Sequence, residues 1–176
     1  MFPHTMGAHR KDDRSGTRGY AHLVEAKVPV GRVWRALTEP SLIRIWQNRE
    51  AEVDARQGGL YRTGMPGQDL REAHIDIFEP NRRLRLIYLN SRDYPPCASA
   101  IVDDFLLDAK PGKTSIRLLG SGVPEGHEWD RPYVKIRMGW ERLLARLRVM
   151  LENPPRPKEP KTDVAPKEPP LPGLDF

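Results

Sequence analysis

The sequence predicts an α+β fold: a curved antiparallel sheet of about seven strands wraps around one long C-terminal helix, with two short helices after the first strand. Three observations support this prediction. Short segments that alternate between apolar and polar residues, joined by turns containing Gly and Pro, are typical of antiparallel strands. Residues 130–151 carry an amphipathic pattern with helical spacing. Pro29 and the pair Glu39-Pro40 mark two short helices early in the chain.

The local patterns predict the elements in order. Residues 20–28 form a strand that ends at Pro29, and apolar residues at helical spacing predict helices over 30–38 and 40–46. Six further strands are expected over residues 51–55, 60–63, 71–79, 82–89, 98–108 and 114–119. The apolar face of the last helix is expected to lie across the concave side of the sheet. That face comprises Tyr133, Ile136, Trp140, Leu143, Leu144, Leu147, Met150 and Leu151.

One folded domain with two tails accounts for the composition. Apolar residues make up only 38% of the 176 residues, because the two ends are poor in them. Eight prolines lie in the segment 152–176. Segments of this kind cannot bury enough apolar surface to offset the entropy lost on ordering. We therefore expect a domain over residues 20–151 between disordered tails at 1–19 and 152–176.

An ordered set of motifs resembles a known family. The motifs are Val33-Trp34-Arg35-Ala36-Leu37-Thr38-Glu39-Pro40, Trp46, Gly58-Gly59-Leu60-Tyr61, Glu79-Pro80 with Leu84, and Gly139-Trp140-Glu141-Arg142-Leu143. Together they resemble the SRPBCC proteins of the START-like, helix-grip superfamily, in the branch similar to the C-terminal domain of the heat shock protein 90 ATPase activator. The resemblance implies a helix-grip fold over residues 20–151. ATPase activation belongs to a two-domain relative, so we do not expect it of this single domain.

A sheet closed by one helix leaves room for an internal cavity, so the sequence predicts the binding of a small hydrophobic or aromatic ligand. Polar anchors for that ligand are expected at His22, His74, Asp104 and Arg117. The expected lining residues are Trp46, Tyr61, Ile75, Ile77, Leu86, Tyr88, Phe105, Trp140, Leu143, Leu144 and Leu147.

Two other functions stay open. The first is a protein-interaction or co-chaperone-like module that uses the long helix or the proline-rich tail. Val134, Met138, Ala145 and Val149 form an apolar stripe on the outer side of that helix, which suits a homodimer or a seat for the tail. The second is an enzyme of the same fold (a cyclase, dehydratase or hydrolase) with an acid–base site at His22, His74 and Asp104. The residue pattern favours a binding protein over an enzyme.

Several classes of function are not expected. The histidine spacings match no metal motif, and no Gly-rich phosphate loop or nucleophile elbow is present, so we expect no metal and no cofactor. The net charge of +5 comes from basic residues spread along the chain, without a nucleic-acid-binding signature. Cys97 is the one cysteine, which excludes an internal disulfide. Without a signal peptide or membrane span, a cytoplasmic protein is expected.

Overall fold

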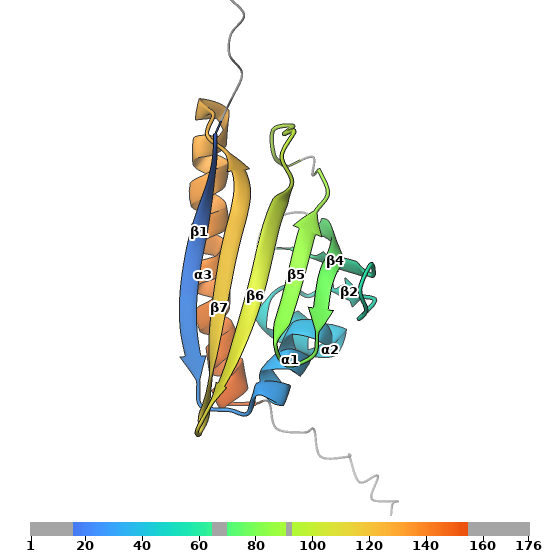
Figure 1. The fold of residues 1–176 in the computed structure, drawn as a ribbon, viewed down its shortest axis with the longest axis vertical. Coiled ribbons are helices and arrows are strands. Elements are labelled where there is room, and N and C mark those ends of the chain that lie inside the picture. The colour runs from blue at the N-terminus through green and yellow to red at the C-terminus, as the bar shows by residue number, and fades with distance from the viewer. Residues whose placement is uncertain (1–15, 65–69, 91–92, 155–176) are drawn as a thin grey trace, which may run out of the picture.

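Seven strands form a single antiparallel sheet in the computed structural model of the chain, which describes residues 16–64, 70–90 and 93–154. The strand order is β1-β7-β6-β5-β4-β3-β2, so only β1 and β7 pair out of sequence order (Figure 1). The strands are β1 (Thr17–Ala26), β2 (Glu52–Val53), β3 (Leu60–Thr63), β4 (Arg71–Glu79), β5 (Arg83–Tyr88), β6 (Ile101–Lys110) and β7 (Lys113–Pro124).

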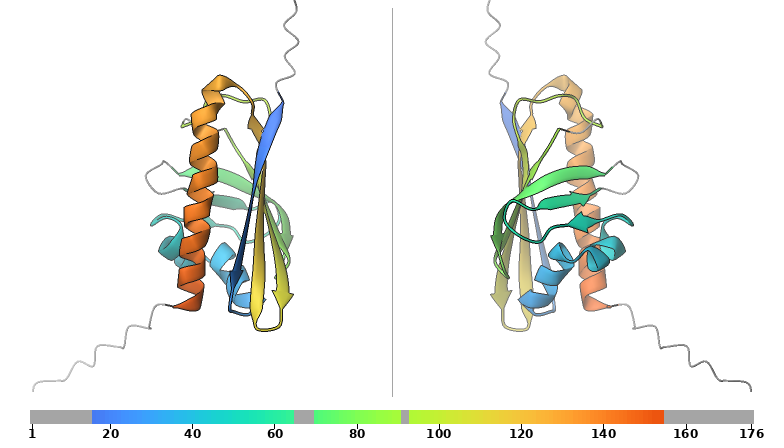
Figure 2. Two further views of the ribbon diagram at one scale, coloured as in Figure 1. Left: turned by 90° about the vertical axis from the view of Figure 1, so that its left-hand side faces the viewer. Right: turned by 90° about the vertical axis from the view of Figure 1, so that its right-hand side faces the viewer.

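The helices lie on one face of this sheet (Figure 2). The long helix α3 crosses the face beside β1, and the two short helices sit near its C-terminal end, at the bottom of Figure 1. A short 3-10 turn, η1, leads into α3 at the opposite end. The bounds are α1 (Val30–Thr38), α2 (Pro40–Trp46), η1 (His127–Trp129) and α3 (Asp130–Glu152).

This architecture confirms the predicted helix-grip fold, with its curved seven-stranded sheet and its two short helices after the first strand. Boundaries differ by a few residues: β1 begins at Thr17, inside the expected N-terminal tail, and α3 continues to Glu152. Strand β7 also extends further than expected, to Pro124. The expectation of disorder over residues 1–15 and 155–176 lies outside the described residues.

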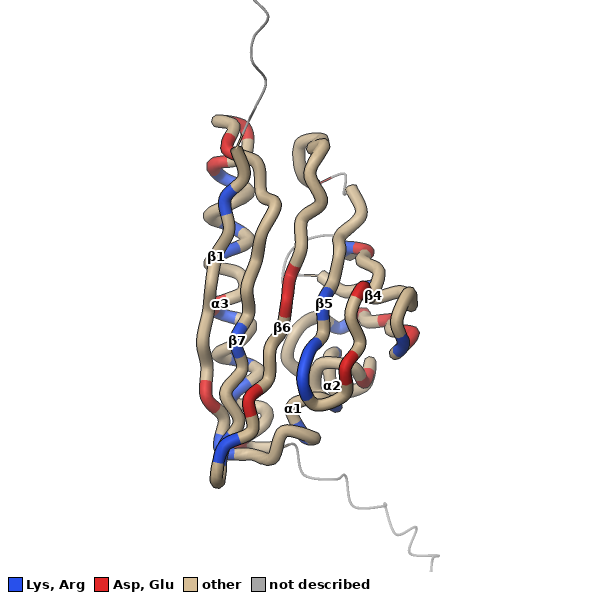
Figure 3. Tube along the Cα trace, in the orientation of Figure 1, with Lys and Arg blue, Asp and Glu red and all other residues tan. Residues whose placement is uncertain are grey.

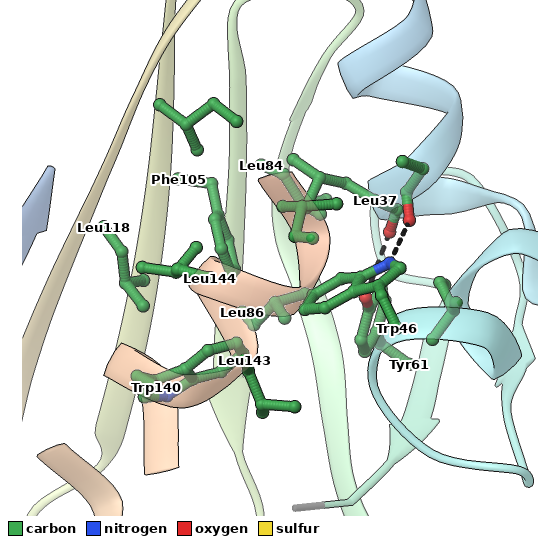
Figure 4. Packing of buried hydrophobic residues seen from close by; sticks show 14 of the residues in the cluster. Leu37, Trp46, Tyr61, Leu84, Leu86, Phe105, Leu118, Trp140, Leu143 and Leu144 are labelled. Carbon is green, nitrogen blue, oxygen red and sulfur yellow. Dashed lines mark hydrogen bonds between the residues drawn. The ribbon is translucent and has the colours of Figure 1, made fainter. Parts of the chain in front are cut away.

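One hydrophobic core fills the space between the sheet and the helices (Figure 4). Near α1 and α2 the polar atoms of two large aromatic side chains are satisfied by the backbone. The Trp46 indole donates from Nε1 to the Ala36 carbonyl oxygen at 2.9 Å, and the Tyr61 hydroxyl donates to the Leu37 carbonyl oxygen at 3.0 Å. Both side chains are therefore buried without leaving an unpaired donor.

A register irregularity in β4 changes which residues face this core. Ile75 pairs with Leu86, but the next regular pair is Ile77 with Arg85, so the strand gains one residue at Asp76. An extra residue of this kind moves the following side chains to the opposite face. Phe78 therefore packs against the core, and the prediction that Ile77 lines the interior is wrong.

The outer face of the sheet carries ion pairs. Arg83 on β5 binds Asp104 on β6 at 2.6 Å, and Arg85 lies 3.6 Å from Asp76. Along the chain trace in Figure 3, acidic positions of β6 lie beside basic positions of β5. These partly exposed ion pairs lie on the face of the sheet opposite the core.

Candidate functional site

A buried carboxylate lies on the inner face of the sheet, at the end away from α1 and α2. Asp103 on β6 is fully buried. It pairs with Gly120 on the neighbouring strand β7, and Gly120 pairs on its other side with Tyr20 on β1. Because Gly120 has no side chain, the Tyr20 ring lies over it and its hydroxyl reaches Asp103 Oδ1 at 2.5 Å. A methyl group at position 120 would lie 2.1 Å from that ring.

Three donors surround the Asp103 carboxyl. Besides Tyr20, the Trp140 indole on α3 donates from Nε1 to Oδ2 at 3.1 Å, and Tyr88 on β5 contributes a further hydrogen bond. Burial raises the pKa of Asp103 above its usual value, although Arg71 and these hydrogen bonds oppose the shift. Asp103 thus holds tyrosine and tryptophan side chains from β1, β5 and α3 around one acceptor.

Arg71 is the buried cation of this site, with a side chain only 4% exposed. Its guanidinium carbon lies 3.8 Å from the centroid of the Tyr88 ring and 5.3 Å from that of Tyr94, within cation–π range. Burial acts to lower the pKa of Arg71, but interactions with Tyr88 and Asp103 outweigh it, so this pKa is raised and the group stays charged. Its Nε atom is buried without a hydrogen-bond partner among the described residues.

A small hollow of about 20 Å³ adjoins this guanidinium. That volume accommodates roughly one water-sized group. Tyr94 and Trp129, which help to line it, stack with ring centroids 5.9 Å apart. The complete lining is Arg71, Tyr88, Leu89, Asn90, Tyr94, Pro95, Cys97, Ser99, Ile101 and Trp129.

The predicted apolar lining residues pack against one another. Apart from Ile77, all of them belong to the buried core, and the rings of Phe105 and Trp140 meet edge-on with centroids 5.4 Å apart. Tyr88 borders the small hollow, and Leu144 borders a surface groove between β1 and α3. These residues therefore form a filled core in this structure, which lends no support to a preformed apolar cavity among them.

The four predicted polar anchors do not come together. His74 and Arg117 are exposed on the outer face of the sheet, and Asp104 binds Arg83 on that same face. His22 is half-buried on the α3 side of β1, where its Nε2 has no hydrogen-bond partner among the described residues. The expected inward positions of His74, Asp104 and Arg117 are wrong because strand alternation turns these side chains outward. The alternative of an acid–base site at His22, His74 and Asp104 therefore finds no support, because these side chains do not face one another.

The alternation of inward and outward side chains along a strand could have indicated two of the residues that form the site. Asp103 is two residues from Phe105, which was expected to face inward, so both belong to the same face of β6. Arg71 likewise shares the parity of Ile75 on β4. Trp129 lies in the short turn η1, where no periodic pattern indicates which side chains are buried.

Residues 16–64, 70–90 and 93–154 contain no cluster of three or more His, Cys, Asp or Glu side chains arranged to hold a metal ion. Among the helices of these residues, none is long and apolar enough to cross a membrane.

Comparison with protein families identifies a match over most of the chain. The sequence model of a family described as Activator of Hsp90 ATPase homolog 1-like protein matches residues 27–152. This range includes every strand except β1, and all of the helices. A search of curated proteins finds no match.

Solved structures share the fold at low sequence identity. Protein MLL2253 from Mesorhizobium loti has a TM-score of 0.68 and 23% identity, over 78% of this chain and 99% of its own. CalU16 from Micromonospora echinospora has a TM-score of 0.61 and 24% identity, over 80% and 78%. Aha1 from Colwellia psychrerythraea, solved as a dimer, has a TM-score of 0.65 and 17% identity, over 77% and 97%. These likenesses support the helix-grip fold described above.

Proposed function

The chain belongs to the Activator of Hsp90 ATPase homolog 1-like family, and from this premise we propose that it binds a small molecule between the sheet and α3, at Arg71 and Asp103. The ligand has an apolar or aromatic body. One observation carries the proposal: the buried Arg71 lines a hollow and has an Nε–H without a partner among the described residues.

The stability of the fold does not by itself explain why Arg71 and Asp103 are buried. A buried ionic group is unfavourable unless it is well paired, and apolar residues of similar volume often stabilise a core equally well. Perturbed ionisable groups beside a hollow are instead typical of binding and catalytic sites. The aromatic rings around Arg71 add an apolar surface on which a planar ligand can pack.

Binding requires a rearrangement, because the hollow holds about 20 Å³. Tyr94 and Trp129 are the stacked rings of its lining, so a ligand larger than one water-sized group has to separate them. The apolar body of the ligand then replaces the ring contacts that are lost. We therefore expect binding to change the fluorescence of Trp129 and to protect the surrounding backbone from hydrogen exchange.

Native mass spectrometry of the gently purified full chain tests this function. We expect a co-purifying small molecule, or saturable binding when the protein is titrated with benzoate, 2-naphthoate, decanoate and their primary amides. Arg117→Gln is the matched control, since Arg117 is exposed on the outer face. The proposal fails if no bound mass is found and no member of this set binds saturably.

A second function, self-association through α3, is favoured by a separate observation. The predicted apolar stripe is exposed to solvent: Val134, Met138 and Val149 are 45%, 40% and 62% exposed, and Ala145 lies between them. Aha1 from Colwellia psychrerythraea was solved as a dimer. We expect light scattering to give a dimer mass for the intact chain and a monomer mass for Met138→Glu. Identical monomer masses would exclude self-association.

A further inference from the structure

We infer that the hollow beside Arg71 receives a carboxylate, so that the ligand is a small carboxylic acid with an apolar or aromatic body. This inference rests on the proposed function and specifies the chemistry of its ligand. It follows from the donors around the hollow, from its volume, and from the charges next to it.

The donors favour a group that only accepts hydrogen bonds. The Cys97 thiol donates to the Ser99 carbonyl oxygen at 3.1 Å, and the Ser99 hydroxyl donates to the Gly122 carbonyl oxygen at 2.8 Å. These two donors of the lining are thus already used. The guanidinium of Arg71, whose Nε–H has no hydrogen-bond partner among the described residues, is the charged donor of this lining. A carboxylate brings two acceptor oxygens and no donor, so it adds no N–H or O–H that would need an acceptor in the hollow.

The volume and the orientation of the cation suit one carboxylate oxygen. A space of about 20 Å³ accepts a single water-sized atom. A phosphate group is larger and carries more charge than one guanidinium balances. The contact with the Tyr88 ring holds the Arg71 guanidinium in place, so its planar fork is already oriented before a ligand arrives.

The neighbouring acid does not compete for this position. The oxygens of Asp103 accept hydrogen bonds from Tyr20 and Trp140, and Tyr88 contributes a third. Asp103 also stabilises the charged form of Arg71, which keeps the guanidinium protonated in the interior. An anionic ligand would therefore find a permanent cation whose nearby carboxylate is already engaged.

Paired titrations of the full chain test the inference. Benzoate, 2-naphthoate and decanoate are compared with their primary amides by calorimetry, and the Arg71 Nε–H resonance is followed by NMR. We expect each acid that binds to bind about tenfold or more tightly than its amide, because a charge-assisted hydrogen bond is lost in the amide. We expect the Nε–H resonance to shift with acids and to shift less with amides.

Variants and outcomes separate the two proposals. Arg71→Gln should reduce the ratio of acid affinity to amide affinity to about one. Arg71→Lys should retain part of this preference, and Arg117→Gln should leave it unchanged. The resonance of Arg71 in the unmodified protein decides the question if Arg71→Gln does not fold. Equal affinities of acids and amides, with an unmoved resonance, would overturn the carboxylate and leave the proposed function intact. Saturable binding by neither class would overturn the proposed function itself.

Discussion

The two ends of the interior differ in the partners of their buried polar atoms. At the apolar end, formed around Leu37, Trp46 and Tyr61, each aromatic polar atom donates to a backbone carbonyl of α1. At the charged end, formed around Arg71 and Asp103, two ionisable side chains are buried and one guanidinium nitrogen has no partner among the described residues. The same helix α3 covers both ends.

Trp140 marks the border between the two ends and shows how they are joined. Its ring meets Phe105 edge-on, as a core residue, while its indole nitrogen donates to Asp103. The apolar end therefore supplies a rigid framework, and the charged end uses that framework to hold groups that folding alone does not require. Substitutions at the apolar end should mainly change stability, whereas those at the charged end should also change binding and pH dependence.

The largest effect is expected at the apolar end. Trp46→Ala removes a fully buried indole and leaves a cavity, so the free energy of unfolding should fall by about 3–5 kcal/mol. The neighbouring variant Ile45→Ala is the control, because Ile45 is 43% exposed and should change stability by about 0.5 kcal/mol. Urea unfolding measures both. Similar losses for the two variants would mean that this end is not a packed framework.

A smaller effect is expected where the two ends are linked across the sheet. In Gly120→Ala the new methyl group would collide with the Tyr20 ring, which must then move away from Asp103. Overpacking of this kind costs about 1–3 kcal/mol. Ser121→Ala, at the next and exposed position, is the control. If Gly120→Ala is as stable as Ser121→Ala, the ring of Tyr20 does not need this gap.

The sequence was sufficient for the architecture because its signals are local. The amphipathic pattern of residues 130–151 and the Pro-marked helices each depend on neighbouring residues alone, and α3, α1 and α2 formed as predicted. The site depends on which strands are neighbours. Nothing near Gly120 in the sequence shows that Tyr20 crosses over it, because that contact requires the pairing of β1 with β7.

Errors at single residues have equally specific causes. Ile77 was misplaced because the extra residue in β4 is visible only when β4 is aligned with β5. The prediction places Asp104 in the interior, but an inward Phe105 implies that Asp103, two residues away, faces inward and that Asp104 faces outward. The burial of Trp129 required the packing of η1 against Tyr94, which no periodic pattern encodes.

The charged end should give the protein a distinctive pH dependence. The pKa of Asp103 is raised in the folded state, so the folded protein binds more protons than the unfolded chain at pH values above the ordinary aspartate pKa of about 3.9. The contribution of Asp103 to stability is therefore greatest below that value and declines as the pH rises through the folded pKa. Unfolding of wild type and Asp103→Asn at a series of pH values measures this difference.

The comparison with Asp103→Asn also isolates this residue from opposite effects elsewhere. Glu25 and Asp130 have lowered pKa values because of hydrogen bonds from Lys113 and Arg18, and such groups lose stability as the pH falls. Their contributions cancel when the free energy of unfolding of Asp103→Asn is subtracted from that of wild type at each pH. A difference that grows as the pH rises would show that Asp103 is instead stabilised in its charged form.

The smallest effect is expected at His22, beside the charged end. Burial lowers its pKa, with Arg137 acting in the same direction, although Glu141, Asp103 and a hydrogen bond to the Arg137 backbone oppose the shift. The folded state then binds fewer protons than the unfolded chain below the ordinary histidine pKa of about 6.5. The stability of wild type relative to His22→Gln should be constant above that pH and decline as the pH falls toward the folded pKa. Ser121→Ala, which alters no titratable group, is the control, and a rise in relative stability on acidification would show that His22 is held in its charged form by Glu141.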